Sequence, residues 1–147
     1  MWEWEAMDFK VHRPKLEEIQ LAFSEPKLAE RLLLVDSSSE IKEEDISTLY
    51  CISIEEGKYK IYLSLAPYKE IDSEGIYELH IAIPKDSIVC GKLLSMATLH
   101  YALNVHAKDV IGIYTNANYR SMANLAINLG FKVIKVEGDF YHLLYVK

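Results

Sequence analysis

One stretch, residues 77–131, constrains the fold of this chain more than any other. It alternates an apolar run, a long segment with apolar residues at helical spacing, a second apolar run and a second helical segment. Two strands joined by a helix of this length run parallel, with a right-handed crossover. Units of this kind bind their ligands at the carboxyl ends of the strands. We therefore expect the functional site at residues 83–85 and 115–118.

The rest of the chain supplies further strands and helices around this central unit. Period-two and three-and-four patterns predict strands at 2–9, 50–54, 59–65, 77–84, 110–114, 131–136 and 141–146, and helices at 14–23, 26–35, 87–106 and 119–129. Ser87 is the expected N-cap of the long helix, with Val89 on its buried face. Gly130 is the expected end of the last helix. The order β-α-α-β-β-β-α-β-α-β-β predicts an α/β (α+β) fold with a mixed central sheet, in a single domain covering residues 1–147.

The composition excludes several classes of function. A net charge of −6 without a dense run of Lys and Arg argues against nucleic-acid binding and against an anionic membrane surface. No apolar run has the length needed to span a bilayer, and the first residues lack the pattern of a signal peptide. We therefore expect a cytoplasmic protein with reduced thiols.

The cysteines and histidines predict no metal site. Cys51 and Cys90 are far apart in the sequence and fit no metal-binding spacing. His100 and His106 fall on different faces of the predicted helix, which makes them a poor metal pair. His142 alternates with apolar residues, as is typical of a histidine in a core or at a sheet edge. A reactive Cys90 at a helix N-terminus stays open as an alternative to an ordinary buried thiol.

Two segments of the central unit carry a family resemblance. Residues 118–131, NYRSMANLAINLGF, resemble the segment of the GNAT superfamily, acetyl-CoA-dependent N-acetyltransferases, in which an Asn precedes a helix that ends in Leu-Gly-Phe. Residues 77–84, YELHIAIP, are similar to the fourth strand of that family. The order of predicted elements also looks like the GNAT order over essentially the whole chain. The resemblance implies a GNAT-like fold, with acetyl-CoA as the cofactor.

The resemblance implies where the pantetheine arm of acetyl-CoA would bind. In GNAT enzymes the arm bonds to strand backbone where the fourth and fifth strands separate, which corresponds here to Ile81 and Ile83. The side-chain amides of Asn116 and Asn118 could bond to a pantetheine carbonyl. Asn118 is equally a good helix N-cap, and this alternative stays open.

The pyrophosphate of the cofactor would lie at the start of the long helix, where free backbone N–H groups favour an anion. Lys85, Cys90, Gly91 and Lys92 are the candidate residues of this turn. The turn departs from the family pattern, because Gly91 is its single glycine and no Arg or Gln stands before it at the family spacing. The positive charges of the two lysines would compensate in part for the backbone N–H groups that a glycine-rich loop directs at the phosphates.

The catalytic candidates are Glu78, His80 and Tyr119. Glu78 and His80 are two apart on one strand and share a face of the sheet. A Glu on this strand often deprotonates the attacking amine in the resembled family, and acyl transfer needs such a base. The family's Tyr, the acid for the leaving thiolate, is replaced by Ala126, with Tyr114 and Tyr119 nearby. A polar strand face or a buried histidine is the alternative interpretation of Glu78 and His80.

The sequence leaves three functional hypotheses. The first is an acetyl-CoA-dependent N-acyltransferase with an unknown amine acceptor. The second is a non-catalytic, partner-binding protein on the same fold, since the chain looks somewhat like a GNAT-like head-assembly protein of tailed phages, which would act in the host cytoplasm. The third is a sensor of acyl-CoA or of a small ligand. The acceptor, the protein partner and homodimer formation stay open.

Overall fold

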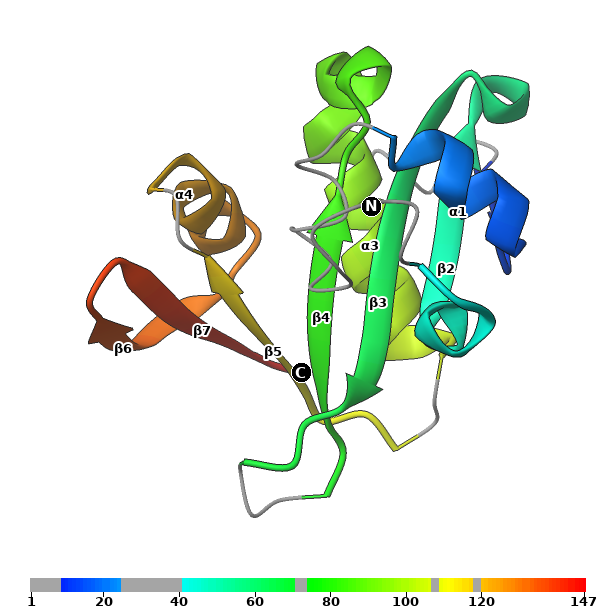
Figure 1. Ribbon diagram of the computed structural model, residues 1–147. Coiled ribbons are helices and arrows are strands. Elements are labelled where there is room, and N and C mark those ends of the chain that lie inside the picture. Colours follow the sequence, from blue (N-terminus) through cyan, green and yellow to red (C-terminus); the bar gives the residue numbers. More distant parts are fainter. Residues whose placement is uncertain (1–8, 25–40, 71–73, 107–108, 118–119) are drawn as a thin grey trace. The chain divides into compact units, whose positions relative to one another are not determined.

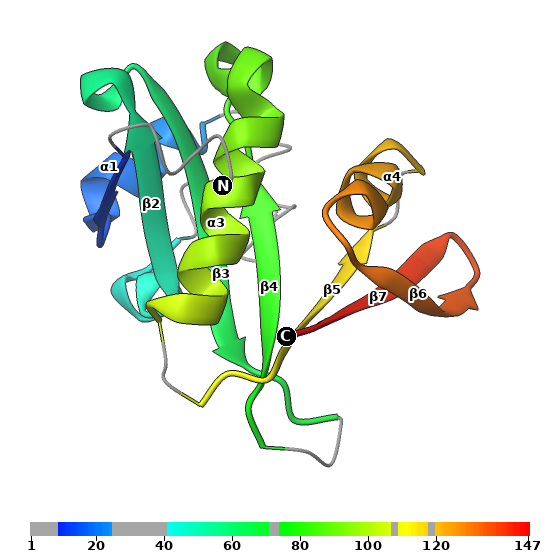
Figure 2. The same cartoon turned by 180° about the vertical axis from the view of Figure 1, so that it is seen from behind.

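The computed structural model of the protein describes residues 9–24, 41–70, 74–106, 109–117 and 120–147 (Figures 1 and 2). The described strands are β1 (Phe9–His12), β2 (Leu49–Ile54), β3 (Tyr59–Pro67), β4 (Ile76–Ala82), β5 (Gly112–Ala117), β6 (Lys132–Glu137) and β7 (Phe140–Val146). The described helices are α1 (Leu16–Ala22), α3 (Gly91–Asn104) and α4 (Arg120–Asn128), and the 3₁₀ segments are η3 (Glu43–Ile46), η4 (Glu55–Gly57) and η5 (Lys85–Cys90). The helix predicted at 26–35 and most of the strand predicted at 2–9 lie outside these residues.

The strands form a seven-stranded sheet in the order β1-β2-β3-β4-β5-β7-β6. Pairs β1–β2, β2–β3, β5–β7 and β6–β7 are antiparallel, whereas β4 and β5 pair in parallel. The parallel pair confirms the expectation from the helix that joins the two strands, and the sheet is mixed as predicted. The chain divides into two compact units, a first unit of residues 1–65 and 80–98 and a second unit of residues 66–79 and 99–147. That residues 1–147 form a single domain stays a prediction.

In the first unit, α1 lies on one face of β2 and β3, and the beginning of α3 lies on the other face (Figures 1 and 2). Its core includes a cluster of buried side chains around α1, β2 and β3, namely Ile19, Phe23, Ile41, Leu49, Cys51, Tyr62 and Ala82. The ring of Phe23 meets the ring of Tyr62 edge-on, with 5.2 Å between ring centroids. Aromatic pairs favour this arrangement because a positive ring edge meets a negative ring face.

The buried face of α1 is a narrow stripe. Ile19 and Phe23, four residues apart, are fully buried, but Leu21 is 79% exposed. Two helical steps turn a residue by about 200°, so Leu21 points away from the face that carries the other two.

The long helix begins later than predicted. Residues Lys85–Cys90 form the 3₁₀ segment η5, and α3 starts at Gly91. Ser87 is therefore no N-cap of α3; it is buried, and its hydroxyl accepts a hydrogen bond of 2.8 Å from the backbone N–H of Lys60. Val89 precedes the helix and is 80% exposed, so it does not join the buried face. Among the described helices, none combines the length and the apolar character needed to cross a bilayer.

The second unit holds β5 between β4 and β7. Gly130 follows α4 with φ of +109°, which confirms it as the residue that ends this helix. Gly75, before β4, also has a positive φ, +89°, and the backbone of Ile111 donates a hydrogen bond of 2.9 Å to its carbonyl oxygen. A Cβ atom on Gly75 would lie 2.5 Å from the backbone oxygen of Asp109. The backbone conformation that leads into β4 therefore requires glycine at position 75.

We expect Gly75→Ala to destabilise the protein by about 1 to 3 kcal/mol more than Gly138→Ala. Both glycines have positive φ, so both substitutions carry the strain of a left-handed backbone. Gly138 has open space around it, whereas Gly75 faces a backbone oxygen that cannot rotate away. Urea denaturation of the two variants measures the difference. Equal destabilisation would show that the close contact at Gly75 relaxes without cost.

Candidate functional site

A row of polar side chains crosses one face of the second unit. Glu78 on β4 is the register partner of Tyr114 on β5, and Asn116 on β5 is the partner of His142 on β7. Register partners in neighbouring strands point to the same face of a sheet, and so do residues two apart on one strand. Glu78, Tyr114, Asn116 and His142 therefore share one face. Glu78 and Asn116, both predicted site residues, thus lie on the same face as Tyr114 and His142, which the sequence did not indicate as a pair.

The centre of this row is a group of three side chains, joined by one hydrogen bond and one ion-pair contact. The hydroxyl of Tyr114, which is buried, bonds to Nδ1 of His142. On the other side of the imidazole, Nε2 lies 3.4 Å from a carboxylate oxygen of Glu137, which also pairs with Lys135 at 3.4 Å. The ring of Tyr68 stacks on the ring of Tyr114, with 4.0 Å between centroids. His142 is thus a bridging residue on β7, between β5 and the edge strand β6, and it is held between a phenol and a carboxylate.

One tautomer of His142 fits both of these contacts. With the proton on Nε2, Nδ1 accepts from the Tyr114 hydroxyl while the N–H of Nε2 faces the Glu137 carboxylate. Burial raises the pKa of Tyr68, and the neighbouring Tyr114 hydroxyl raises it further. Tyr68 therefore stays a neutral phenol that supports the orientation of Tyr114.

The parallel ladder that carries Glu78 is short. It comprises the pairs Ile76–Gly112, Tyr77–Ile113 and Glu78–Tyr114, whereas β4 continues to Ala82 and β5 to Ala117. Within the second unit, the hydroxyl of Thr115 donates a hydrogen bond of 2.7 Å to the carbonyl oxygen of Leu79, where the ladder ends. Glu78 is therefore the last residue of β4 in the described ladder with β5.

The turn after β4 belongs to the first unit and combines cationic with apolar side chains. Lys85 and Lys92 are exposed, one at the start of η5 and one at the start of α3. Between them, Ile88 and Val89 are 63% and 80% exposed. Exposed cations beside exposed apolar side chains suit a ligand that carries both phosphates and an apolar arm.

The same turn lacks a glycine-lined cradle. Gly91 is buried, but an added Cβ atom would lie 3.4 Å from Cδ1 of Ile83, which is ordinary contact. The absence of a side chain at Gly91 therefore does not bring its backbone unusually close to a neighbouring group. Asp86 is exposed in the same turn and adds a negative charge. The residues present therefore fit a phosphate by lysine charge and helix N–H groups rather than by a glycine loop.

The other predicted site residues are distributed as follows. His80, Ile81, Ile83 and Cys90 belong to the first unit, where His80 is buried and the other three are half-buried. Cys90 is a free thiol. Asn118 and Tyr119 lie outside the described residues, so their predicted roles stay predictions. The sequence offered one signal for the missed residue His142, a histidine inside an otherwise apolar strand.

Comparison with known structures places the fold. No family model and no curated protein matches the sequence. A GNAT-family acetyltransferase from Bacillus anthracis superposes with a TM-score of 0.64 at 10% identity, covering 95% of this chain and 96% of that one. The aminoglycoside acetyltransferase AAC(6')-Ib in complex with coenzyme A gives 0.67 at 11% identity, covering 95% of each chain. Spermidine N-acetyltransferase from Vibrio cholerae, in complex with CoA and spermine, gives 0.67 at 12% identity, covering 94% and 95%. The chain has the fold of the GNAT acetyltransferases, as the sequence predicted.

Proposed function

We propose that the protein is an N-acyltransferase that moves the acetyl group of acetyl-CoA to an amine. The observation that carries the proposal is the position of Glu78, which stands beside Tyr114 at the last rung of the β4–β5 ladder. The GNAT fold supports it, because solved proteins of this fold include acetyltransferases in complex with coenzyme A. Fold likeness alone does not establish an activity, so the proposal rests on the residues of this site.

In the proposed reaction, the carboxylate of Glu78 accepts a proton from the ammonium form of the acceptor, since only the neutral amine has a lone pair to attack with. The neutral amine nitrogen forms a bond to the acetyl carbon, the bond from that carbon to sulfur breaks, and the nitrogen releases its surplus proton to water. The Tyr114 hydroxyl gives its proton to the leaving thiolate and regains one through His142. This assignment makes Tyr114 a catalytic candidate beside Tyr119, which lies outside the described residues.

The cofactor would bind by two kinds of contact. The backbone of β4 near Ile81 and Ile83 would bond to the pantetheine amides, with Ile88 and Val89 covering its apolar parts. Lys85 and Lys92 would face the phosphates. Weaker binding than with a closed loop of backbone N–H groups follows, because the charges of two exposed lysines are screened by water and salt.

Calorimetric titration with acetyl-CoA and with acetyl-pantetheine, which has no phosphates, tests this assignment. We expect Lys85→Glu and Lys92→Glu each to weaken acetyl-CoA binding about tenfold, since each reverses a charge beside the phosphates. Both variants should bind acetyl-pantetheine as the unmodified protein does. Lys10→Glu is the matched control, because Lys10 is exposed on β1 of the same unit. No saturable binding of acetyl-CoA at millimolar concentration would overturn the proposed function.

A second candidate function, binding of a protein partner without catalysis, is favoured by one observation. The hairpin of β6 and β7 exposes large apolar side chains, namely Val133, Ile134, Val136, Phe140 and Val146. Exposed apolar groups that gather on one element are typical of interaction surfaces. The head-assembly role belongs to this candidate and stays a prediction. An acetylation assay with a panel of amines, in which the released thiol of coenzyme A is measured, separates the two candidates. An acyltransferase releases the thiol, whereas a non-catalytic binding protein does not.

A further inference from the structure

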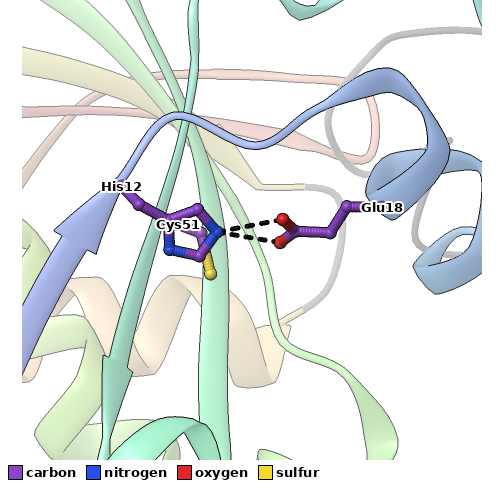
Figure 3. Close-up of side chains that lie close together, drawn as sticks. All are labelled: His12, Glu18 and Cys51. Atoms are coloured by element: carbon purple, nitrogen blue, oxygen red, sulfur yellow. Dashed lines mark hydrogen bonds and ion pairs between the residues drawn. The ribbon is translucent and has the colours of Figure 1, made fainter.

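The side chains of His12, Glu18 and Cys51 meet in the first unit. His12 on β1 is the register partner of Cys51 on β2, and Cys51 is the partner of Tyr62 on β3. These three residues form a row across adjacent strands and point to the same face. Helix α1 lies over that face and brings Glu18 to the row (Figure 3).

The contacts in this group are short and specific. Nε2 of His12 lies 3.0 Å from both carboxylate oxygens of Glu18. One ligand atom from each of His12, Glu18 and Cys51 lies within 4.8 Å of the other two. Figure 3 shows the imidazole and carboxylate facing each other, with the Cys51 sulfur beside the ring. The hydroxyl of Tyr62 donates a hydrogen bond of 3.2 Å to the Glu18 carboxylate and so fixes its orientation.

The spacing matches a small tetrahedral ion. Bonds of about 2.0 to 2.3 Å from a central metal place its ligand atoms about 3.3 to 3.7 Å apart. The imidazole and carboxylate already stand at nearly this separation, and the sulfur needs to move by about 1 Å or less to complete the set. Thiolate, imidazole and carboxylate together are a zinc-type donor set, and a hydrogen-bonded carboxylate is a frequent feature around such ions.

Charge and exposure agree with this geometry. A divalent ion with one thiolate and one carboxylate forms a neutral group, which a half-buried position tolerates. Cys51 is fully buried, while the side chains of His12 and Glu18 are 43% and 28% exposed, so the fourth position of the ion would face water.

We propose that His12, Glu18 and Cys51 form a binding site for a zinc-type divalent cation, with water as the fourth ligand. The ion would join β1, α1 and β2 and thereby stabilise the first unit. The competing interpretation is a His12–Glu18 ion pair above a cysteine that merely fills the core. This site does not depend on the proposed acyltransferase activity.

Titration of the reduced, chelator-treated full chain with Co²⁺ tests the site, because Co²⁺ takes the same ligands and reports on them by absorption. We expect one equivalent to produce a thiolate-to-metal charge-transfer band and the visible bands of a tetrahedral ion, and Zn²⁺ to remove both. Cys51→Ser should abolish the charge-transfer band. His12→Gln and Glu18→Gln should weaken Co²⁺ binding by more than about tenfold. Cys90→Ser is the matched control and should leave every band in place.

Folding of each variant is checked by circular dichroism. If Cys51→Ser does not fold, the two substitutions at the half-exposed positions 12 and 18 decide the matter, because they leave the core intact. The absence of a charge-transfer band at stoichiometric Co²⁺ would overturn the proposal. A band that survives in His12→Gln and Glu18→Gln with unchanged affinity, or that disappears in Cys90→Ser, would overturn it as well.

Discussion

Replacing Phe23 by alanine is expected to destabilise the protein by about 3 to 5 kcal/mol. The ring is fully buried at the end of α1 and packs against Tyr62 and the other side chains of the first unit's core. Its removal loses the transfer free energy of an aromatic side chain and leaves a cavity that the sheet beneath cannot fill. For a chain of this length the loss corresponds to a fall of roughly 10 to 16 °C in Tm.

Leu21→Ala provides the matched control for Phe23→Ala. It removes a large apolar side chain from the same helix, but Leu21 is 79% exposed. We expect a change within about 0.5 kcal/mol, as for other surface substitutions. Chemical denaturation with the same probe measures both variants. Comparable losses at the two positions would contradict the assigned orientation of α1.

The order and type of the elements followed from the sequence because each strand and helix has a strong local pattern. Residues 77–131 predicted the parallel pair, and Gly130 predicted the end of α4, since both depend on a few neighbouring residues. The beginning of α3 was misplaced for a tertiary reason. Ser87 has the residue type of an N-cap, but its hydroxyl bonds to the backbone of Lys60, a residue distant in sequence. Local propensity cannot anticipate such a contact.

The candidate sites were harder to predict from the sequence for the same reason, because they depend on contacts between residues that are distant in the chain. Asn116 could be placed because the end of its strand is visible in the pattern, and Glu78 because its strand resembles the fourth strand of the GNAT family. The Tyr114–His142 bond, in contrast, depends on the register of β5 against β7. The grouping of His12 and Cys51 depends in turn on the register of β1 against β2. Register is set by how whole strands pair, so the spacing of residues along the chain does not contain it.

Glu78→Gln is expected to lower kcat/KM for acetyl transfer by about 10²- to 10⁴-fold, the usual contribution of a positioned base. The amide keeps the size of the carboxylate but cannot accept a proton from the amine. Affinity for acetyl-CoA should not change, because Glu78 is not among the residues proposed to hold the cofactor. Steady-state kinetics with the best amine of a panel, together with calorimetric titration, separates the two effects.

The pH profile distinguishes a base from a residue that only supports the fold. With Glu78 acting as the base, the acidic limb of the kcat/KM profile should be lost in Glu78→Gln, and amines of lower pKa should recover part of the rate, since more of each is already neutral. Glu44→Gln, an exposed residue of η3 with the same change of charge, should leave rate and profile unaltered. A Glu78→Gln variant that keeps the full rate and the acidic limb would assign the proton transfer to another group on this face. Tyr114→Phe then becomes the decisive substitution, because it removes the hydroxyl that bonds to His142 and keeps the ring that stacks on Tyr68.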